Sequence, residues 1–189
     1  MKILLPFLYL FFYIVSSQNT TTTEPPTVVT YVKLSRHDSI SCQGLSQFEV
    51  YYPSSSCQGN TAYRCYDGSP VLSVYDNLGC EGDPTRMVQQ ESCANQIQTS
   101  CVASLPPKEG IQTHYYDTLQ ECIDGIKQTK IEYQSNHLCA AYNSKSCANS
   151  EILLSYYQNY ECSEIIMTIP RAARQCEYFS GQFVKEICN

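Results

Sequence analysis

The sequence contains no tryptophan, only three histidines (His37, His114 and His137) and no two cysteines in the C-x-x-C spacing. Structural zinc sites are typically built from closely spaced cysteine and histidine ligands. The histidines stand outside any catalytic motif, and the chain carries no serine-hydrolase, zinc-protease, P-loop or dinucleotide-binding signature. We therefore expect no enzyme activity, no metal and no cofactor.

Charge is also scarce. Charged residues make up 16% of the chain, and the formal net charge is −6 at pH 7. Nucleic acids and anionic membranes attract proteins that carry basic patches. The mildly acidic balance argues against both, and we expect no nucleic-acid partner.

Long hydrophobic runs are missing except at the start of the chain. Lys2 precedes an apolar run over residues 3–15, and the small residues Ser16 and Ser17 follow it. This is the pattern of a secretory signal peptide, and the run is too short for a lasting membrane anchor. We expect a signal peptide over residues 1–17, no stable membrane insertion, and a protein that is secreted or held in a secretory organelle.

Cysteine, by contrast, is abundant, with twelve residues in the chain. An even number of cysteines in an oxidising compartment predicts that all of them are paired, here in six disulfides. The residues are Cys42, Cys57, Cys65, Cys80, Cys93, Cys101, Cys122, Cys139, Cys147, Cys162, Cys176 and Cys188.

The spacing of the cysteines repeats. The first six are separated by 15, 8, 15, 13 and 8 positions, and the last six by 17, 8, 15, 14 and 12. At an offset of 82 positions, Tyr75 also aligns with Tyr157 and Asn77 with Asn159. We infer two tandem copies of one six-cysteine module, each forming three disulfides within itself and in the same order. The sequence leaves open whether the two copies share one sheet.

The organisation along the chain follows from this repeat. A Thr- and Pro-rich leader is expected over residues 18–30, and Asn19 begins its N-glycosylation sequon. Module one covers residues 31–104, a linker covers 105–110, and module two covers 111–189.

The local patterns favour strands. Alternating aromatic and β-branched residues predict strands at residues 47–52 and 71–75, and turn residues predict hairpins over 64–75 and 176–188. Short helices are expected within 83–92 and within 117–128, the second capped by Thr118 and Glu121. The fold class is therefore a mainly β, small disulfide-rich fold of two tandem modules, with a disulfide-rich α+β fold as the alternative.

Tyrosine is the other abundant residue, with sixteen copies. Its ring combines apolar area with a polar hydroxyl, which suits ligand-binding faces and also suits the cores of small domains. Tyr52, Tyr75 and Tyr157 each stand five residues before a cysteine and are the candidate binding residues.

These observations predict a secreted, non-enzymatic binding or structural protein of an extracellular coat or matrix. A glycan is the first expected ligand, and a protein is the second. One alternative is a small secreted hydrolase that uses carboxylates of module one. Another is a secreted protease inhibitor that presents the segment "SLPPK" at residues 104–108. The carboxylates in question are Asp67, Asp76, Glu81 and Asp83.

Overall fold

The computed structural model describes residues 30–46, 48–105 and 109–188. The expected signal peptide, nearly all of the leader with Asn19, and the centre of the linker lie outside these residues. The described part is mainly β, as the sequence predicts, with one short helix.

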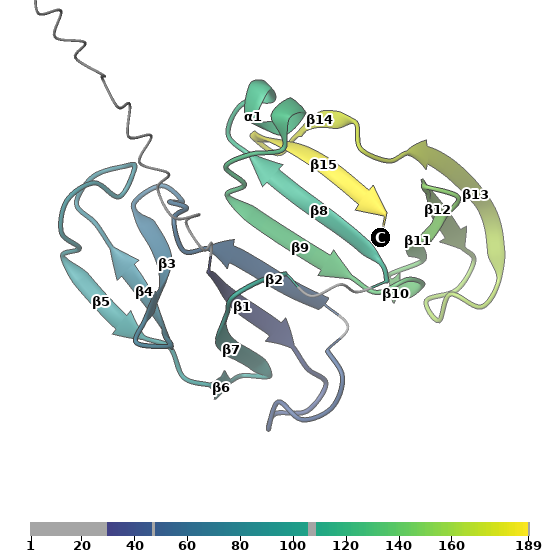
Figure 1. The fold of residues 1–189 in the computed structure, drawn as a ribbon. Helices are drawn as coiled ribbons and strands as arrows, with labels where there is room; N and C mark the ends of the chain where they lie inside the picture. Colours follow the sequence, from purple (N-terminus) through teal and green to yellow (C-terminus); the bar gives the residue numbers. More distant parts are fainter. Residues whose placement is uncertain (1–29, 47, 106–108, 189) are drawn as a thin grey trace, which may run out of the picture.

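The largest element is an eight-stranded antiparallel sheet that runs through both modules (Figure 1). Its strand order is β14-β15-β8-β9-β2-β1-β7-β6. From module one come β1 (Tyr31–Arg36), β2 (Phe48–Pro53), β6 (Cys93–Ala94) and β7 (Ile97–Val102). From module two come β8 (Ile111–Tyr116), β9 (Lys130–Gln134), β14 (Cys176–Phe179) and β15 (Gln182–Cys188). The two modules therefore share one sheet, a point that the sequence left open.

The modules meet where β2 pairs with β9. Glu49 lies opposite Tyr133, and Tyr51 lies opposite Ile131. The offset of 82 positions makes Tyr133 the counterpart of Tyr51, and Ile131 the counterpart of Glu49. Equivalent strands therefore meet antiparallel about a pseudo-two-fold axis, as they do in a symmetric dimer with an isologous interface.

Each module adds a smaller sheet beside the shared one. Module one forms a three-stranded sheet of β3 (Thr61–Tyr66), β4 (Ser69–Val74) and β5 (Arg86–Gln89). Module two forms a four-stranded sheet of β10 (Leu138–Ala140), β11 (Asn143–Ala148), β12 (Glu151–Tyr157) and β13 (Ile165–Ala172). The β3–β4 and β14–β15 hairpins confirm the two hairpins predicted from turn residues.

The two expected helices have different outcomes. Helix α1 (Leu119–Asp124) is confirmed: the Thr118 hydroxyl accepts a hydrogen bond from the Glu121 amide, and Gly125 ends the helix in a left-handed conformation. The helix expected within residues 83–92 is wrong, because β5 occupies this segment and pairs with β4. Tertiary pairing overrides the weak helical preference of this stretch, and its counterpart in module two, β13, is also a strand.

The disulfides repeat the same pairing in both modules. Numbered within each module, the first cysteine joins the fifth, the second joins the fourth, and the third joins the sixth. No cysteine is free, and no bridge crosses between the modules. The bridges are Cys42–Cys93, Cys57–Cys80, Cys65–Cys101, Cys122–Cys176, Cys139–Cys162 and Cys147–Cys188. Each bridge typically contributes about 2–4 kcal/mol, which compensates for the thin core of a module this small.

The main core cluster lies at the module junction, on one face of the shared sheet. Tyr51, Ile131 and Tyr133 are buried there, and the partly buried Tyr31, Val102 and Leu105 pack against them. The Tyr133 hydroxyl donates a hydrogen bond to the Glu109 carbonyl. A Cβ at the neighbouring Gly110 would come within 2.5 Å of the Gln134 carbonyl oxygen. Glycine is therefore required where the chain enters module two.

This arrangement predicts how the chain responds to cleavage after Lys108. In native buffer the nicked protein should elute as one particle, because the β2–β9 pairing and the junction core hold the halves together. In denaturant without reductant the halves should separate, because no disulfide joins them. Size-exclusion chromatography and intact mass of trypsin-nicked protein check both steps. Halves that stay joined in denaturant until reductant is added would contradict the pairing.

Candidate functional site

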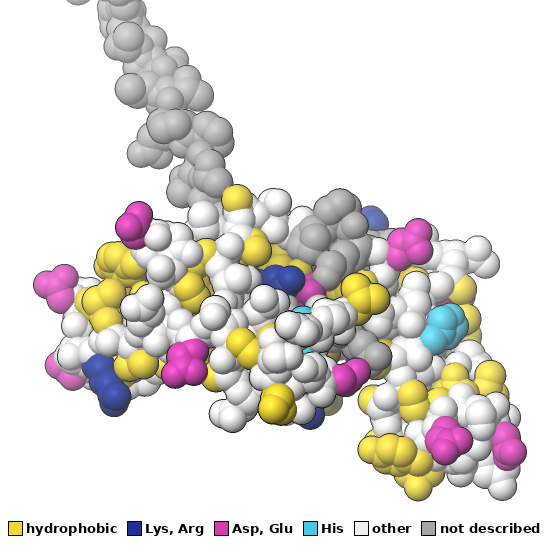
Figure 2. Space-filling view, turned by 90° about the horizontal axis from the view of Figure 1, so that it is seen from below, with side chains coloured by type: hydrophobic (Ala, Val, Ile, Leu, Met, Phe, Trp, Pro, Cys, Tyr) yellow, Lys and Arg dark blue, Asp and Glu magenta, His cyan; other side chains and the backbone are white. Residues whose placement is uncertain are grey.

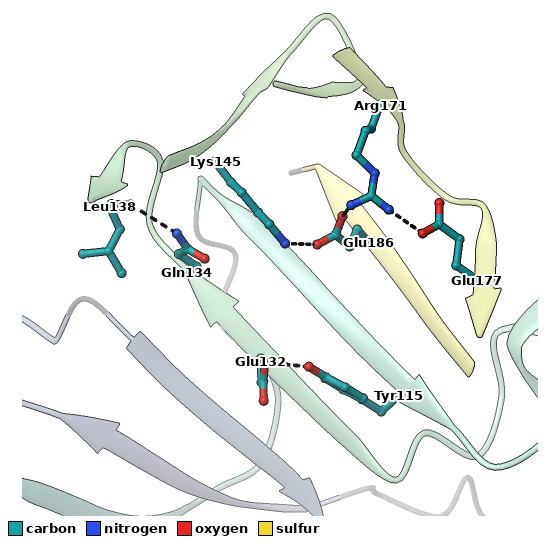
Figure 3. Close-up of polar contacts among 8 residues, drawn as sticks. All are labelled: Tyr115, Glu132, Gln134, Leu138, Lys145, Arg171, Glu177 and Glu186. Carbon is teal, nitrogen blue, oxygen red and sulfur yellow. Dashed lines mark hydrogen bonds and ion pairs between the residues drawn. The ribbon is translucent and has the colours of Figure 1, made fainter. Parts of the chain in front are cut away.

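A polar groove lies over the other face of the shared sheet, in module two. It encloses about 180 Å³ between this sheet and the small sheet of β10–β13 (Figure 3). We call it the module-two groove. Its lining residues are Phe48, Thr113, Tyr115, Glu132, Gln134, Lys145, Arg171, Glu177, Phe179, Val184 and Glu186. Alternation along β9 explains the division of faces, since Ile131 and Tyr133 point to the core whereas Glu132 and Gln134 line the groove.

An ion-pair network crosses the upper part of the groove. Lys145 on β11 binds the carboxylate of Glu186 on β15, and Arg171 on β13 contacts the same carboxylate at 3.6 Å. Arg171 also binds Glu177 on β14, and this hydrogen bond raises the pKa of Arg171. The cations come from the small sheet and the carboxylates from the large one, so the network holds the two sheets together over the groove (Figure 3).

A second polar cluster forms the lower wall. The Tyr115 hydroxyl donates to Glu132 Oε2 at 2.7 Å, and Lys130 Nζ donates to Glu132 Oε1 at 2.8 Å. Lys130 Nζ also lies 3.9 Å from the centroid of the Tyr115 ring, in cation–π contact. Burial, followed by the hydrogen bond to Glu132, raises the pKa of the Tyr115 hydroxyl. This hydroxyl therefore stays protonated at physiological pH and acts as a donor, not as a base.

The groove exists because the two modules have diverged. In module one Tyr52 and Tyr63 stack with ring centroids 4.5 Å apart. At the offset of 82 positions, module two has Gln134 and Lys145 in their places. The stacked rings are thus replaced by an amide and an ammonium group, and both of these side chains line the groove.

The three candidate tyrosines do not form one repeated site. Tyr75 is buried, with 7% of its surface exposed, so its ring offers little area to a ligand. Tyr157 is half-buried, and its hydroxyl is bonded to the Ser144 hydroxyl at 3.0 Å. Only Tyr52 belongs near the groove: burial, Tyr63 and then Glu132 raise the pKa of Tyr52 to about 12. Tyr75 and Tyr157 thus lie in different surroundings, and neither lines the module-two groove.

Asp67 lies apart from the other three module-one carboxylates. Asp67 lies in the turn before β4, whereas Asp76, Glu81 and Asp83 lie in the loop after it, and all four are exposed. The six residues of β4 separate the two ends by roughly 20 Å. Asp67 and Asp76 are therefore too far apart to act as a glycosidase acid pair, which needs about 5–10 Å.

The segment proposed as an inhibitor loop is described only in part. Ser104 and Leu105 are described, and Leu105 packs against the junction core. Residues 106–108 lie outside the described residues.

Among the described residues, no cluster of three or more His, Cys, Asp or Glu side chains could hold a metal ion. Within the described ranges no helix has the length and apolar character needed to cross a membrane. The chain matches no protein-family model, no curated protein and no solved structure.

Two carboxylates of the groove are already engaged by neighbouring side chains. Both oxygens of Glu132 and both oxygens of Glu186 already have cationic or hydroxyl partners. What remains is a surface of aromatic ring, amide and fixed charge that a polar ligand could contact. None of the lining residues is among the candidate binding residues Tyr52, Tyr75 and Tyr157, and Tyr52 lies only at the border of the groove. The sequence does carry one signal for the groove, which is a difference between the two copies of the repeat. Tyr52 and Tyr63 of module one align with Gln134 and Lys145 of module two.

Proposed function

We propose that the protein is a secreted, non-enzymatic binding or structural protein of an extracellular coat or matrix, and that the module-two groove binds its ligand. The observation that carries this proposal is the groove itself, which opens where module two has Gln134 and Lys145 in place of a stacked tyrosine pair. Six disulfides in a chain of this size are compatible with an extracellular location.

A carbohydrate is the ligand class that this lining fits best. Tyr115, Phe179 and Phe48 supply aromatic surface against which a sugar ring can stack. Glu132, Gln134 and Arg171 supply the planar acceptors and donors that sugar hydroxyls require. With Lys130, Lys145 and Arg171 against Glu132, Glu177 and Glu186, the site is close to electrically neutral. An uncharged oligosaccharide is therefore favoured over a strongly anionic one.

The proposal predicts that Phe179→Ala weakens oligosaccharide binding about tenfold, because it removes an exposed ring from the groove wall. A glycan array identifies the ligand, and titration calorimetry with soluble chito-, cello- and xylo-oligosaccharides measures the affinity. No hydrolysis of the same sugars is expected.

Tyr178→Ala is the matched control. Tyr178 and Phe179 are neighbours on β14 with 68% and 66% of their surfaces exposed, but only Phe179 lines the groove. Tyr178→Ala should therefore leave affinity within a factor of about two. Equal losses in the two variants would show that the groove is not the binding site, and an array without any bound glycan would reject carbohydrate as the ligand.

A further inference from the structure

β13 is an exposed and apolar edge strand. It ends the four-stranded sheet and, at eight residues, is the longest edge strand in the described part of the chain. Ile165, Ile166, Met167 and Ile169 keep 38–65% of their surfaces exposed. In Figure 2 hydrophobic side chains are visible on the lobe at the lower right, which β10–β13 form. An edge of this kind is a template for pairing with another strand.

The module-one counterpart shows that the fold does not require this apolar edge. β5 occupies the equivalent position but is four residues long. Arg86 pairs with Val74, and Met167 pairs with Tyr156, which is the counterpart of Val74 at the offset of 82. Arg86 of β5 thus stands where β13 has Met167, and Gln89 stands where β13 has Pro170. A charged, short edge resists pairing with other chains, whereas β13 is twice as long and carries no charge over residues 165–169.

We propose that β13 pairs with β13 of a second copy of this chain, antiparallel and about a two-fold axis. The chain already joins two equivalent edges in this manner, where β2 of module one meets β9 of module two. Residues 165–169 carry no charge, so two copies meet without repulsion between like charges. The paired small sheets would form a second eight-stranded sheet.

The ends of β13 limit the length of this pairing. Pro170 has no N–H to donate, and the register of β12 with β13 shifts at Ile166, because Tyr156 pairs with Met167 whereas Tyr157 pairs with Ile165. Pairing is therefore confined to residues 165–169 and is centred on Met167, with Ile165 opposite Ile169 of the second copy. Such a contact buries less than the roughly 800 Å² per partner of a standard interface. We expect a dissociation constant on the order of 10–100 µM.

Sedimentation velocity over roughly 1–500 µM protein tests the proposal across the expected dissociation constant. The full chain, produced through an oxidising secretory pathway, should shift from monomer to dimer over this range. Met167→Lys should weaken dimerisation at least tenfold, because it places an ammonium group opposite its own copy. Hydrogen exchange should show that the amides of residues 165–169 exchange more slowly at high protein concentration.

Met87→Lys is the matched control, because Met87 of β5 and Met167 of β13 are both 47% exposed on edge strands of the two modules. It should leave dimerisation unchanged, and circular dichroism should show that both variants are folded. A protein that stays monomeric over the whole range would overturn the proposal. So would a dimer that survives Met167→Lys, or one that Met87→Lys weakens equally.

Discussion

Replacing Glu49 by alanine should lower the free energy of unfolding by about 3–5 kcal/mol. The Glu49 side chain is 1% exposed and lies at the module junction, on β2 opposite Tyr133. Its carboxylate is 3.0 Å from Lys33 Nζ and accepts hydrogen bonds from the hydroxyls of Ser46 and Tyr51 at 2.5 Å each. Removing it leaves the buried Tyr51 hydroxyl and the Lys33 ammonium group without their acceptor. The total free energy of unfolding of a single domain is only about 5–15 kcal/mol.

A second Lys–Glu pair at the same junction provides the control. Lys130 and Glu132 are 2.8 Å apart, but their side chains keep 22% and 25% of their surfaces exposed. Water can replace the lost partner there, so Glu132→Ala should cost only about 1 kcal/mol. Urea unfolding with intact disulfides, followed by tyrosine fluorescence and circular dichroism, measures both losses. Similar losses in the two variants would show that burial does not decide the effect.

A double variant distinguishes two effects of removing Glu49. One is the loss of its hydrogen bonds, and the other is the charge of Lys33 that is left without a partner. Replacing a whole buried ion pair by apolar residues of similar volume is often neutral, whereas removing one partner is strongly destabilising. Lys33→Met combined with Glu49→Leu should therefore recover at least half of the stability that Glu49→Ala loses. A double variant as unstable as the single one would assign the loss to the hydroxyl partners Ser46 and Tyr51 instead.

The parts of this fold that the sequence predicted are those set by local chemistry or by repetition. Cysteine spacing predicted equivalent pairing in both modules, because a bridge tolerates little change in the separation of its Cα atoms. Turn residues such as Gly68 and Gly181 marked hairpins, since both adopt the positive φ that glycine permits. Thr118 and Glu121 marked the start of α1 for a similarly local reason.

The failures share a different cause, which is contact between distant segments. The helix predicted within residues 83–92 is wrong because the strand character of β5 comes from its pairing with β4. The module-two groove combines residues from β2, β8, β9, β11, β13, β14 and β15, and no local pattern brings them together. Asp67 and Asp76, by contrast, are close in sequence but separated in space, because they lie at opposite ends of β4.

His114 should make the protein lose stability as the pH falls. Its ring is 8% exposed on β8, its Nε2 lies 2.9 Å from Gln112 Oε1, and its buried Nδ1 has no hydrogen-bond partner among the described residues. Burial, together with Lys185 on the neighbouring β15, lowers the pKa of His114 from 6.5 to about 4. The native protein therefore keeps this ring neutral at a pH where the unfolded chain protonates it.

The direction of the pH dependence follows from that difference. Above pH 6.5 the ring is neutral in both states, and its full contribution to stability is present. As the pH falls from 6.5 towards 4, the unfolded state binds a proton that the native state does not, and about 3 kcal/mol is lost. Below pH 4 both states bind the proton, and no further loss comes from this residue.

His114→Phe keeps a flat ring at this position and removes the titration. Urea unfolding at pH 7.5, 5.5 and 4.5 should show that the variant loses less stability on acidification than the original protein does. Between pH 7.5 and 4.5 the difference between His114→Phe and the original protein should grow by about 2–3 kcal/mol in favour of the variant. A difference that stays constant with pH would mean that the His114 ring has the same proton affinity in the native and unfolded states.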